Sequence, residues 1–540
     1  MSLKRETAWV VRSARRAARP AVSMAAVGRG GVDPDGVGYA PHHTSTVKRW
    51  EEAASDLTYW NVRRYEFLLG LPHGQLTCAV DHLARWRQPV RQQAVLRPPE
   101  ARPVAETLEL LEKALSTERM TGADWDLLTD DLGRMPHPLV RDRDWEAMLR
   151  RLVAECVVNL DVEYLLRDEA AARLAGHPRS GQIVARFVRS VIDDPGSQFF
   201  NDTLTLLQFT DEPQALGILA EQLREPANDH ALRACLFALT TLARGRRLPP
   251  QYLRDVVPSA LRLVRDTSLP YRVQRGAANV IRSVASDVGV QLATALSLED
   301  QRAAASILLS GRAVDRDTLA RMKRGVRAHM DAGVADTWDE PELQLLVDTA
   351  LGSTDEHDRG MALSVLMLVP QGHWVGRAQA QQLREALAAD DDVAALETLA
   401  VLSWLVQSED APLLVDLALD PTRPAALAAE AATVLGNITD RDAGQAVDAD
   451  RRLALGIFTA LRGIPDDTRR LGARTGATPD AVLRVHGFAY ALGMRGRFDL
   501  MAGIRNSPLL TEHEYGAELA GILDYWLDLP EHIRPPAGEP

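Results

Sequence analysis

Residues 258–284 have the sequence PSALRLVRDTSLPYRVQRGAANVIRSV, and residues 412–438 have the sequence PLLVDLALDPTRPAALAAEAATVLGNI. In both, apolar residues recur every three or four positions on either side of an Asp/Pro turn, the spacing of amphipathic helices. The two segments match in register at Asp266/Asp420, Pro270/Pro424, Ala277/Ala431, Ala278/Ala432 and Val280/Val434. Each segment therefore predicts two helices joined by a short turn, and the match indicates an internal repeat.

Weaker copies of the same pattern occur at residues 219–243, 346–369 and 383–406. In these segments, we expect the acid of the turn to cap the second helix and the paired small residues to let adjacent helices approach closely. The pattern resembles HEAT-type repeats over residues 105–525, with a period of roughly 35–45 residues. The resemblance implies an all-α fold with an α-solenoid body, whose long concave face suits protein partners and carries no preset active site.

Composition agrees with this fold class. A chain of 540 residues is too long for one ordinary core, which stops growing near ~250–300 residues. Aromatic residues make up only 5% of the chain, and alanine and leucine dominate, which favours helices over sheet. The three cysteines are far apart in sequence, which predicts a reducing cytosol and neither disulfides nor a zinc site. No apolar run is long enough for a membrane helix, and no secretion signal is expected.

Charge is distributed unevenly along the chain. Residues 1–102 contain 16 basic and 9 acidic side chains, a balance of +7, whereas the remaining 438 residues have a balance of −19. A basic N-terminal segment on an acidic body is a pattern found in proteins that contact nucleic acid. Arginine-rich helices can also be simply solvated, so the charge alone leaves both interpretations open.

The segment TSTVKRWEE, residues 44–52, gives the basic N-terminal part a specific pattern. Helical spacing places Val47 and Trp50 on an inward face and leaves Lys48 and Arg49 outside. Thr44 or Ser45 is expected to cap this helix. Hydroxyl groups at a helix start bind phosphates, and long cationic side chains reach base edges in the major groove. The residues therefore favour a helix that binds duplex DNA.

TSTVKRWEE, together with VRRYEFLLGLPHGQL at residues 62–76, resembles the Xre/Cro/lambda-repressor-type helix-turn-helix of actinobacterial regulators. The resemblance covers residues 7–85. It implies that Trp50 is a core residue and Glu51 a local helix-stabilising acid. It also implies a recognition helix, and an earlier helix opened by a serine that lies across the DNA backbone; the implied contacts with double-stranded DNA come from Ser23, Thr44, Ser45, Thr46, Lys48 and Arg49.

Three departures from the family pattern leave a second hypothesis open. Met24 occupies the position where the family usually has glutamine, residues 30–43 form a long Gly/Pro/Asp loop in place of a tight turn, and the glycine after RWE is absent. The alternative is a HEAT-like protein-interaction scaffold with a vestigial DNA-binding head. A third hypothesis, a HEAT-like DNA base glycosylase, needs a cationic groove, which the charge of −19 disfavours.

The expected organisation is a helix-turn-helix domain at 1–87, a Pro-rich linker or docked strap at 88–104, the solenoid at 105–528 and a tail at 529–540. Acidic clusters at 355–358 and 390–392 fall at repeat turns and are interpreted as helix caps. We therefore expect no catalytic residue, cofactor or metal. The leading hypothesis is a cytoplasmic, nucleoid-associated transcriptional regulator that forms a homo-oligomer, with residues 514–529 as either a dimer edge or a terminal cap.

Overall fold

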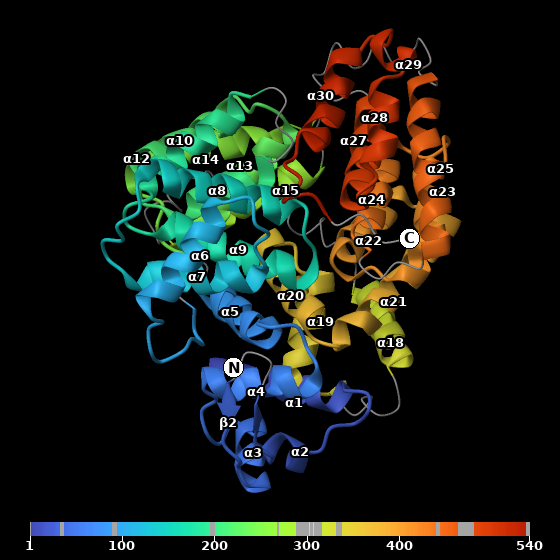
Figure 1. The fold of residues 1–540 in the computed structure, drawn as a ribbon. Coiled ribbons are helices and arrows are strands. Elements are labelled where there is room, and N and C mark those ends of the chain that lie inside the picture. The colour runs from blue at the N-terminus through green and yellow to red at the C-terminus, as the bar shows by residue number, and fades with distance from the viewer. Residues whose placement is uncertain are drawn as a thin grey trace. The chain divides into compact units, whose positions relative to one another are not determined.

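A computed structural model describes residues 2–32, 37–88, 94–194, 200–266, 269, 271–287, 302, 306, 316–330, 337–438, 443–462 and 480–535. These residues are almost entirely helical (Figure 1), which confirms the all-α prediction. One small antiparallel sheet pairs Gly31 with Tyr39 and Val32 with Gly38. Within the described residues, no helix is long and apolar enough to cross a membrane.

The N-terminal 87 residues, termed the head, contain five helices and the small sheet. Their bounds are α1 (Leu3–Ala17), α2 (Met24–Gly28), β1 (Gly31–Val32), β2 (Gly38–Tyr39), α3 (Thr44–Glu51), α4 (Tyr59–Leu69) and α5 (Gln75–Arg87). The strands lie inside the segment that the sequence suggested to be a loop.

The chain divides into two compact units. The first unit includes the head and continues to Gly372, apart from two short segments. After the head its elements are α6 (Val104–Leu115), α7 (Gly122–Arg134), α8 (Asp142–Val157), α9 (Asp161–Gly176), α10 (Gly181–Ile192), α11 (Phe200–Leu204), η1 (Thr205–Phe209), α12 (Pro213–Arg224), α13 (Asp229–Arg244), α14 (Pro250–Arg265), α15 (Tyr271–Asp287), α18 (Arg316–His329), α19 (Pro341–Gly352) and α20 (Glu356–Leu368).

The second unit begins at His373. Its elements are α21 (Gln371–Ala388), α22 (Asp392–Leu405), η3 (Ser408–Asp410), α23 (Ala411–Leu419), α24 (Ala425–Gly436), α25 (Ala443–Arg462), α27 (Asp480–Met494), α28 (Phe498–Arg505), α29 (Pro508–Thr511) and α30 (Gly516–Leu527). Each of the five repeat-like sequence segments spans two helices separated by a short turn, as predicted. In the first unit α12 packs on α14 and α13 on α15, and in the second α22 packs on α24.

The turn acid caps the second helix in two of the segments, and Asn228 takes this position in a third; the turn of the segment 258–284 lies partly outside the described residues. Asn228 accepts from the Ala231 N–H at 2.9 Å, and Asp391 caps α22 in the same way at 3.0 Å. Asp355 caps α20 through the His357 N–H at 2.9 Å. The prediction is wrong for Asp420, because its carboxylate bonds to Thr422 inside the turn.

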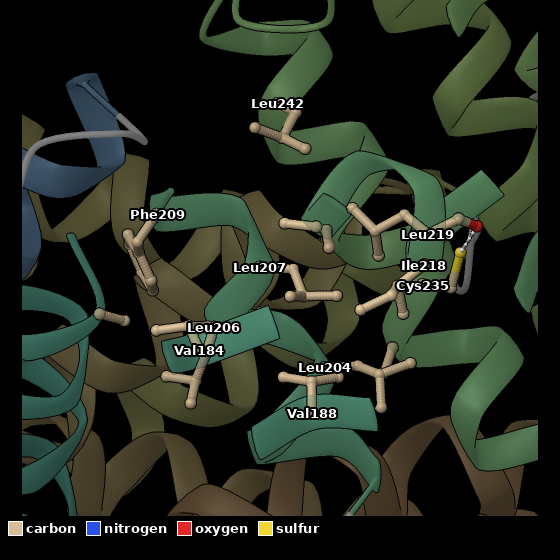
Figure 2. Packing of buried hydrophobic residues seen from close by; sticks show 14 of the residues in the cluster. Val184, Val188, Leu204, Leu206, Leu207, Phe209, Ile218, Leu219, Cys235 and Leu242 are labelled. Atoms are coloured by element: carbon tan, nitrogen blue, oxygen red, sulfur yellow. Dashed lines mark hydrogen bonds between the residues drawn. The ribbon is translucent and has the colours of Figure 1, made fainter. Parts of the chain in front are cut away.

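The core of the first unit consists of leucine, valine and alanine side chains from successive helices. Figure 2 shows Val184, Val188, Leu204 and Leu207 packed together, with Cys235 close by. The Cys235 thiol donates to the Leu219 carbonyl at 3.0 Å, and burial raises the pKa of that thiol. All three cysteines are buried and unoxidised, as expected of inert core thiols.

The described part of the Pro-rich segment, residues 94–103, is docked on the first unit. Its Val95 N–H donates to the Asp81 carboxylate at 2.6 Å, and Arg102 pairs with Asp131 at 2.9 Å. The Pro98 carbonyl accepts from Arg134 at 2.8 Å. Of the two alternatives, the docked strap therefore fits these residues and the free linker does not.

The C-terminal apolar stripe is buried inside the second unit. Leu519, Ile522, Leu523 and Trp526 of α30 are at most 3% exposed, and α30 packs on α27 and α28. Ile533, in the expected tail, is also buried. Leu527, the remaining residue of the stripe, is half-buried. Most of the stripe is thus covered within its own unit, as a terminal cap requires.

Candidate nucleic-acid interface

Helix α3 is held in the head by three side chains on one face. Val47 is fully buried, Trp50 is 4% exposed and Glu51 is 1% exposed. The His42 ring packs edge-on against the Trp50 ring with centroids 4.9 Å apart. Partial burial and the charge of Arg64 lower the pKa of His42, so this histidine is neutral at physiological pH and supplies no cation to the surface.

Glu51 is the centre of a buried polar network, and its expected role as a local helix-stabilising acid is wrong. The Arg15 guanidinium of α1 donates to both carboxylate oxygens, at 2.6 and 2.7 Å, and the Tyr65 hydroxyl donates at 3.1 Å. Arg12 donates to the Glu51 carbonyl at 2.5 Å. The hydrogen bond that Arg15 donates to Glu51 raises the pKa of Arg15. Because α1, α3 and α4 all contribute, this network fixes the orientation of α3.

The opposite face of α3 is open to solvent and carries most of the residues selected from the sequence. Thr44, Ser45, Lys48 and Arg49 are exposed, and Thr46 is half-buried. The Lys48 ammonium lies 3.6 Å from the Glu52 carboxylate, with both side chains more than half exposed. No ion pair or hydrogen bond of the Arg49 side chain is found within the described residues, so this guanidinium is available to a ligand.

Capping of α3 differs from the prediction. The sequence suggested Thr44 or Ser45 as the N-cap, but His43 occupies that position and its Nδ1 accepts from the Ser45 N–H at 3.2 Å. The Ser45 Oγ also lies 2.8 Å from this nitrogen. Ser and Thr are preferred at the N-cap position, and histidine is uncommon there. Capping preference alone therefore does not predict His43 as the N-cap of α3.

Ser23 caps α2 as predicted, because its Oγ accepts from the Ala26 N–H at 3.1 Å. The ends of the insertion between α2 and α3 are pinned together: the Gly28 carbonyl accepts from the His42 N–H at 2.7 Å. A Cβ atom on Gly28 would lie 2.5 Å from the His42 carbonyl oxygen, so glycine is needed here. As a result, α2 and α3 are in contact despite the long insertion.

Arg63 and Arg64 are not part of this surface, although the sequence placed them in the basic segment. Both are buried, at 6% and 2% exposure. Arg63 pairs with Glu66, and Arg64 donates to the Ala40 carbonyl while its guanidinium lies 5.5 Å from the Tyr39 ring centroid. These two charges hold the head together and are not available to phosphate.

The arginines of α1 face carboxylates at the start of α19. Arg5 pairs with Glu342 at 2.6 Å, and Arg12 and Arg16 both pair with Glu340 at 3.2 Å. Part of the +7 balance of the N-terminal segment is therefore neutralised within the first unit. The contacts join residues more than 320 positions apart, which no local sequence pattern reveals.

Helix α5 connects the head to the rest of the first unit. Every residue from Leu76 to Arg85 is buried, as expected for a helix covered on all sides. The Gln75 amide donates to the Leu368 carbonyl at 2.8 Å, and the Trp86 indole donates to Asp358 at 2.9 Å. These contacts join α5, and with it the head, to α20 within the first unit.

Charged residues of α5 and α9 meet in the same buried junction. Arg85 pairs with Glu169 and, at 3.3 Å, with Asp168. Asp81 lies 3.5 Å from Arg173. Burial, together with the nearby charge of Glu169, raises the pKa of Asp81 to about 8, against the opposing effect of Arg173.

This junction predicts a specific pH dependence of stability. The unfolded chain releases the Asp81 proton near pH ~4, whereas the folded protein holds it up to about pH 8. Stability contributed by this group is therefore present below pH ~4 and is lost as the pH rises through 8. Asp81→Asn, which mimics the protonated acid, should stabilise the protein at pH 8.5 by up to about 5 kcal/mol and have little effect at pH 4.

Urea denaturation of both proteins at pH 4, 6 and 8.5 measures this difference. Asp255→Asn, at an exposed position of α14, serves as the control and should leave the pH profile unchanged. Equal stability changes for Asp81→Asn at all three pH values would show that Asp81 is already ionised in the folded protein.

The acidic cluster 355–358 has partners on neighbouring helices. Asp355 pairs with Arg244 at 3.0 Å and with Arg282 at 2.6 Å, and Glu356 pairs with Arg275 at 3.1 Å. In the part of the chain that the structure describes, no group of three or more side chains could hold a metal ion. The interpretation of this cluster as a helix cap is confirmed for Asp355, whose carboxylate accepts from the His357 N–H.

Comparison with known proteins adds no identification. No protein-family model matches the sequence, and the search of curated proteins gives no match either.

Proposed function

We propose that the protein is a sequence-specific DNA-binding regulator that reads duplex DNA with the exposed face of α3. The observation that carries the proposal is the orientation of this helix. Val47, Trp50 and Glu51 fix one side, while Lys48 and Arg49 extend from the other. A rigidly held helix with long cationic side chains fits the major groove of B-DNA.

Two further features favour the proposal. The exposed hydroxyls of Thr44 and Ser45 lie at the N-terminal end of α3, where hydroxyl and amide groups suit phosphate oxygens. The buried Arg15–Glu51 pair removes an acid from the neighbourhood of the binding face, since the Glu51 charge is compensated inside the head. In this proposal the helical body carries surfaces for self-association or for a protein partner.

We expect Arg49→Ala and Lys48→Ala to have different effects on DNA binding. Loss of a bidentate base contact by Arg49 should cost about 1–3 kcal/mol of discrimination between preferred and random duplexes. Loss of a phosphate contact by Lys48 should weaken binding to all duplexes equally and reduce the slope of log affinity against log salt by about 0.9. The measurement is fluorescence anisotropy with the full-length protein and duplexes selected from a random library.

Arg254→Ala provides a matched control, because Arg254 is an exposed arginine on α14 of the same unit. It should leave both affinity and sequence preference unchanged. The proposal fails if the wild-type protein shows no binding at low salt, or if both α3 variants bind as the wild type does.

The scaffold hypothesis is favoured by a different observation. The ion pairs of Arg5, Arg12 and Arg16 with Glu340 and Glu342 show that basic residues of the head bind carboxylates within the same unit. If the basic residues of the head serve only to make these ion pairs, the head has no need to bind DNA. Wild-type protein that captures no duplex from the random library, yet stays folded, would favour this second function.

A further inference from the structure

Helix α18 is a basic helix within an otherwise acidic body. Residues 316–329, RDTLARMKRGVRAH, contain five basic side chains and one acidic side chain, a balance of +4. The residues outside the N-terminal segment have a balance of −19. The average over the body thus conceals a strong local charge of the opposite sign.

The apolar face of α18 is already covered. Met322, Val326 and Met330 are at most 7% exposed, and the helix packs on α19 (Figure 1). Leu319 approaches Gly352 of α19 so closely that a Cβ atom there would lie 3.1 Å from its side chain. This face is therefore not available for insertion into a lipid surface, which requires an exposed apolar stripe.

The other side of α18 is cationic and faces solvent. Arg321, Arg324 and Arg327 are all exposed and follow one another at three-residue spacing, so they form a row about 9 Å long. Lys323 pairs with Asp348 of α19 at 2.6 Å, which fixes the helix. Among the residues that the structure describes, neither Arg324 nor Arg327 has a carboxylate partner.

We propose that this face of α18 is a second DNA-contacting surface, which binds the phosphate backbone without reading sequence. The proposal rests on the proposed function of α3, with which α18 shares the first compact unit. Guanidinium groups bind phosphate oxygens with good geometry, and a row of them on a fixed helix releases condensed counterions on binding. Base recognition then belongs to α3, and α18 contributes affinity that depends on salt.

The test is the double variant Arg324→Gln/Arg327→Gln in the full-length protein. Two lost phosphate contacts should reduce the slope of log affinity against log salt by about 1.8 and leave sequence preference unchanged. The control is Arg119→Gln/Arg254→Gln, which removes two exposed arginines elsewhere in the same unit and should leave the slope unchanged. Circular dichroism of both variants verifies that the helices are retained.

The possible outcomes separate this inference from the function of α3. An unchanged slope in the α18 variant overturns the inference and leaves the α3 proposal intact. If the α18 variant has a reduced slope while Arg49→Ala keeps the sequence preference of the wild type, the phosphate-binding role of α18 is supported and base reading by α3 is overturned. No binding by the wild type overturns both. Binding to phosphatidylserine vesicles that is lost in the α18 variant, with an unchanged DNA slope, would assign the surface to anionic lipid and overturn the inference.

Discussion

Replacing Glu66 with alanine should lower the free energy of unfolding by about 3–5 kcal/mol, because it leaves a buried charge without its partner. Glu66 is fully buried and accepts hydrogen bonds from the backbone N–H groups of Gly74, Leu76 and Thr77, at 3.0, 2.7 and 3.0 Å. It also pairs with Arg63. The variant would remove the carboxylate that pairs with Arg63 and that accepts from three backbone N–H groups at the N-terminal end of α5.

Urea denaturation gives the magnitude of this effect, and hydrogen–deuterium exchange shows where it occurs. Exchange should increase first in α4 and α5, since Glu66 joins these helices. Glu109→Ala, at an exposed position of α6, is the control and should change stability by no more than about 0.5 kcal/mol. A Glu66→Ala protein as stable as this control would mean that the carboxylate contributes nothing net to the junction.

The second large effect is expected for Glu51→Ala, again about 3–5 kcal/mol. The substitution removes the acceptor of both Arg15 bonds and of the Tyr65 hydroxyl, all within the head. Because the same network orients α3, we expect DNA affinity to fall together with stability, even though Glu51 is buried and faces away from the binding surface.

The neighbouring acid provides the matched control for this variant. Glu52 is adjacent in sequence but exposed, and its only described ion pair is the 3.6 Å contact with Lys48. Glu52→Ala should therefore change the free energy of unfolding by less than about 1 kcal/mol. Equal urea midpoints for the Glu51 and Glu52 variants would contradict the assignment of Glu51 to a buried network.

Features set by local spacing could be predicted from the sequence. The buried positions of Val47 and Trp50, the exposure of Lys48 and Arg49, and the Ser23 cap follow from helical period and capping preference. The paired helices of the five repeat-like segments follow for the same reason. The DNA-binding role itself and the solenoid arrangement stay predictions.

Features set by distant partners could not be predicted. Arg64 looks like a surface cation in the sequence, but it is buried and donates to the Ala40 carbonyl in another part of the head. The partners of Arg5 and Arg16 lie more than 320 residues away. The cationic face of α18 could not be predicted for another reason. A net charge summed over hundreds of residues conceals the positive charge of a single helix of 14 residues.

The burial of α5 has a consequence for how the protein is made. Its partner helix α20 lies almost 300 residues further along the chain, as the contact between Gln75 and Leu368 shows. At about 5–20 residues per second, a ribosome needs roughly 15–60 s to synthesise the intervening segment. During that interval the apolar side chains of α5 are without their cover, and the nascent head depends on chaperones or on delayed folding. Completion of α20 is thus the step at which a newborn chain covers this face of α5.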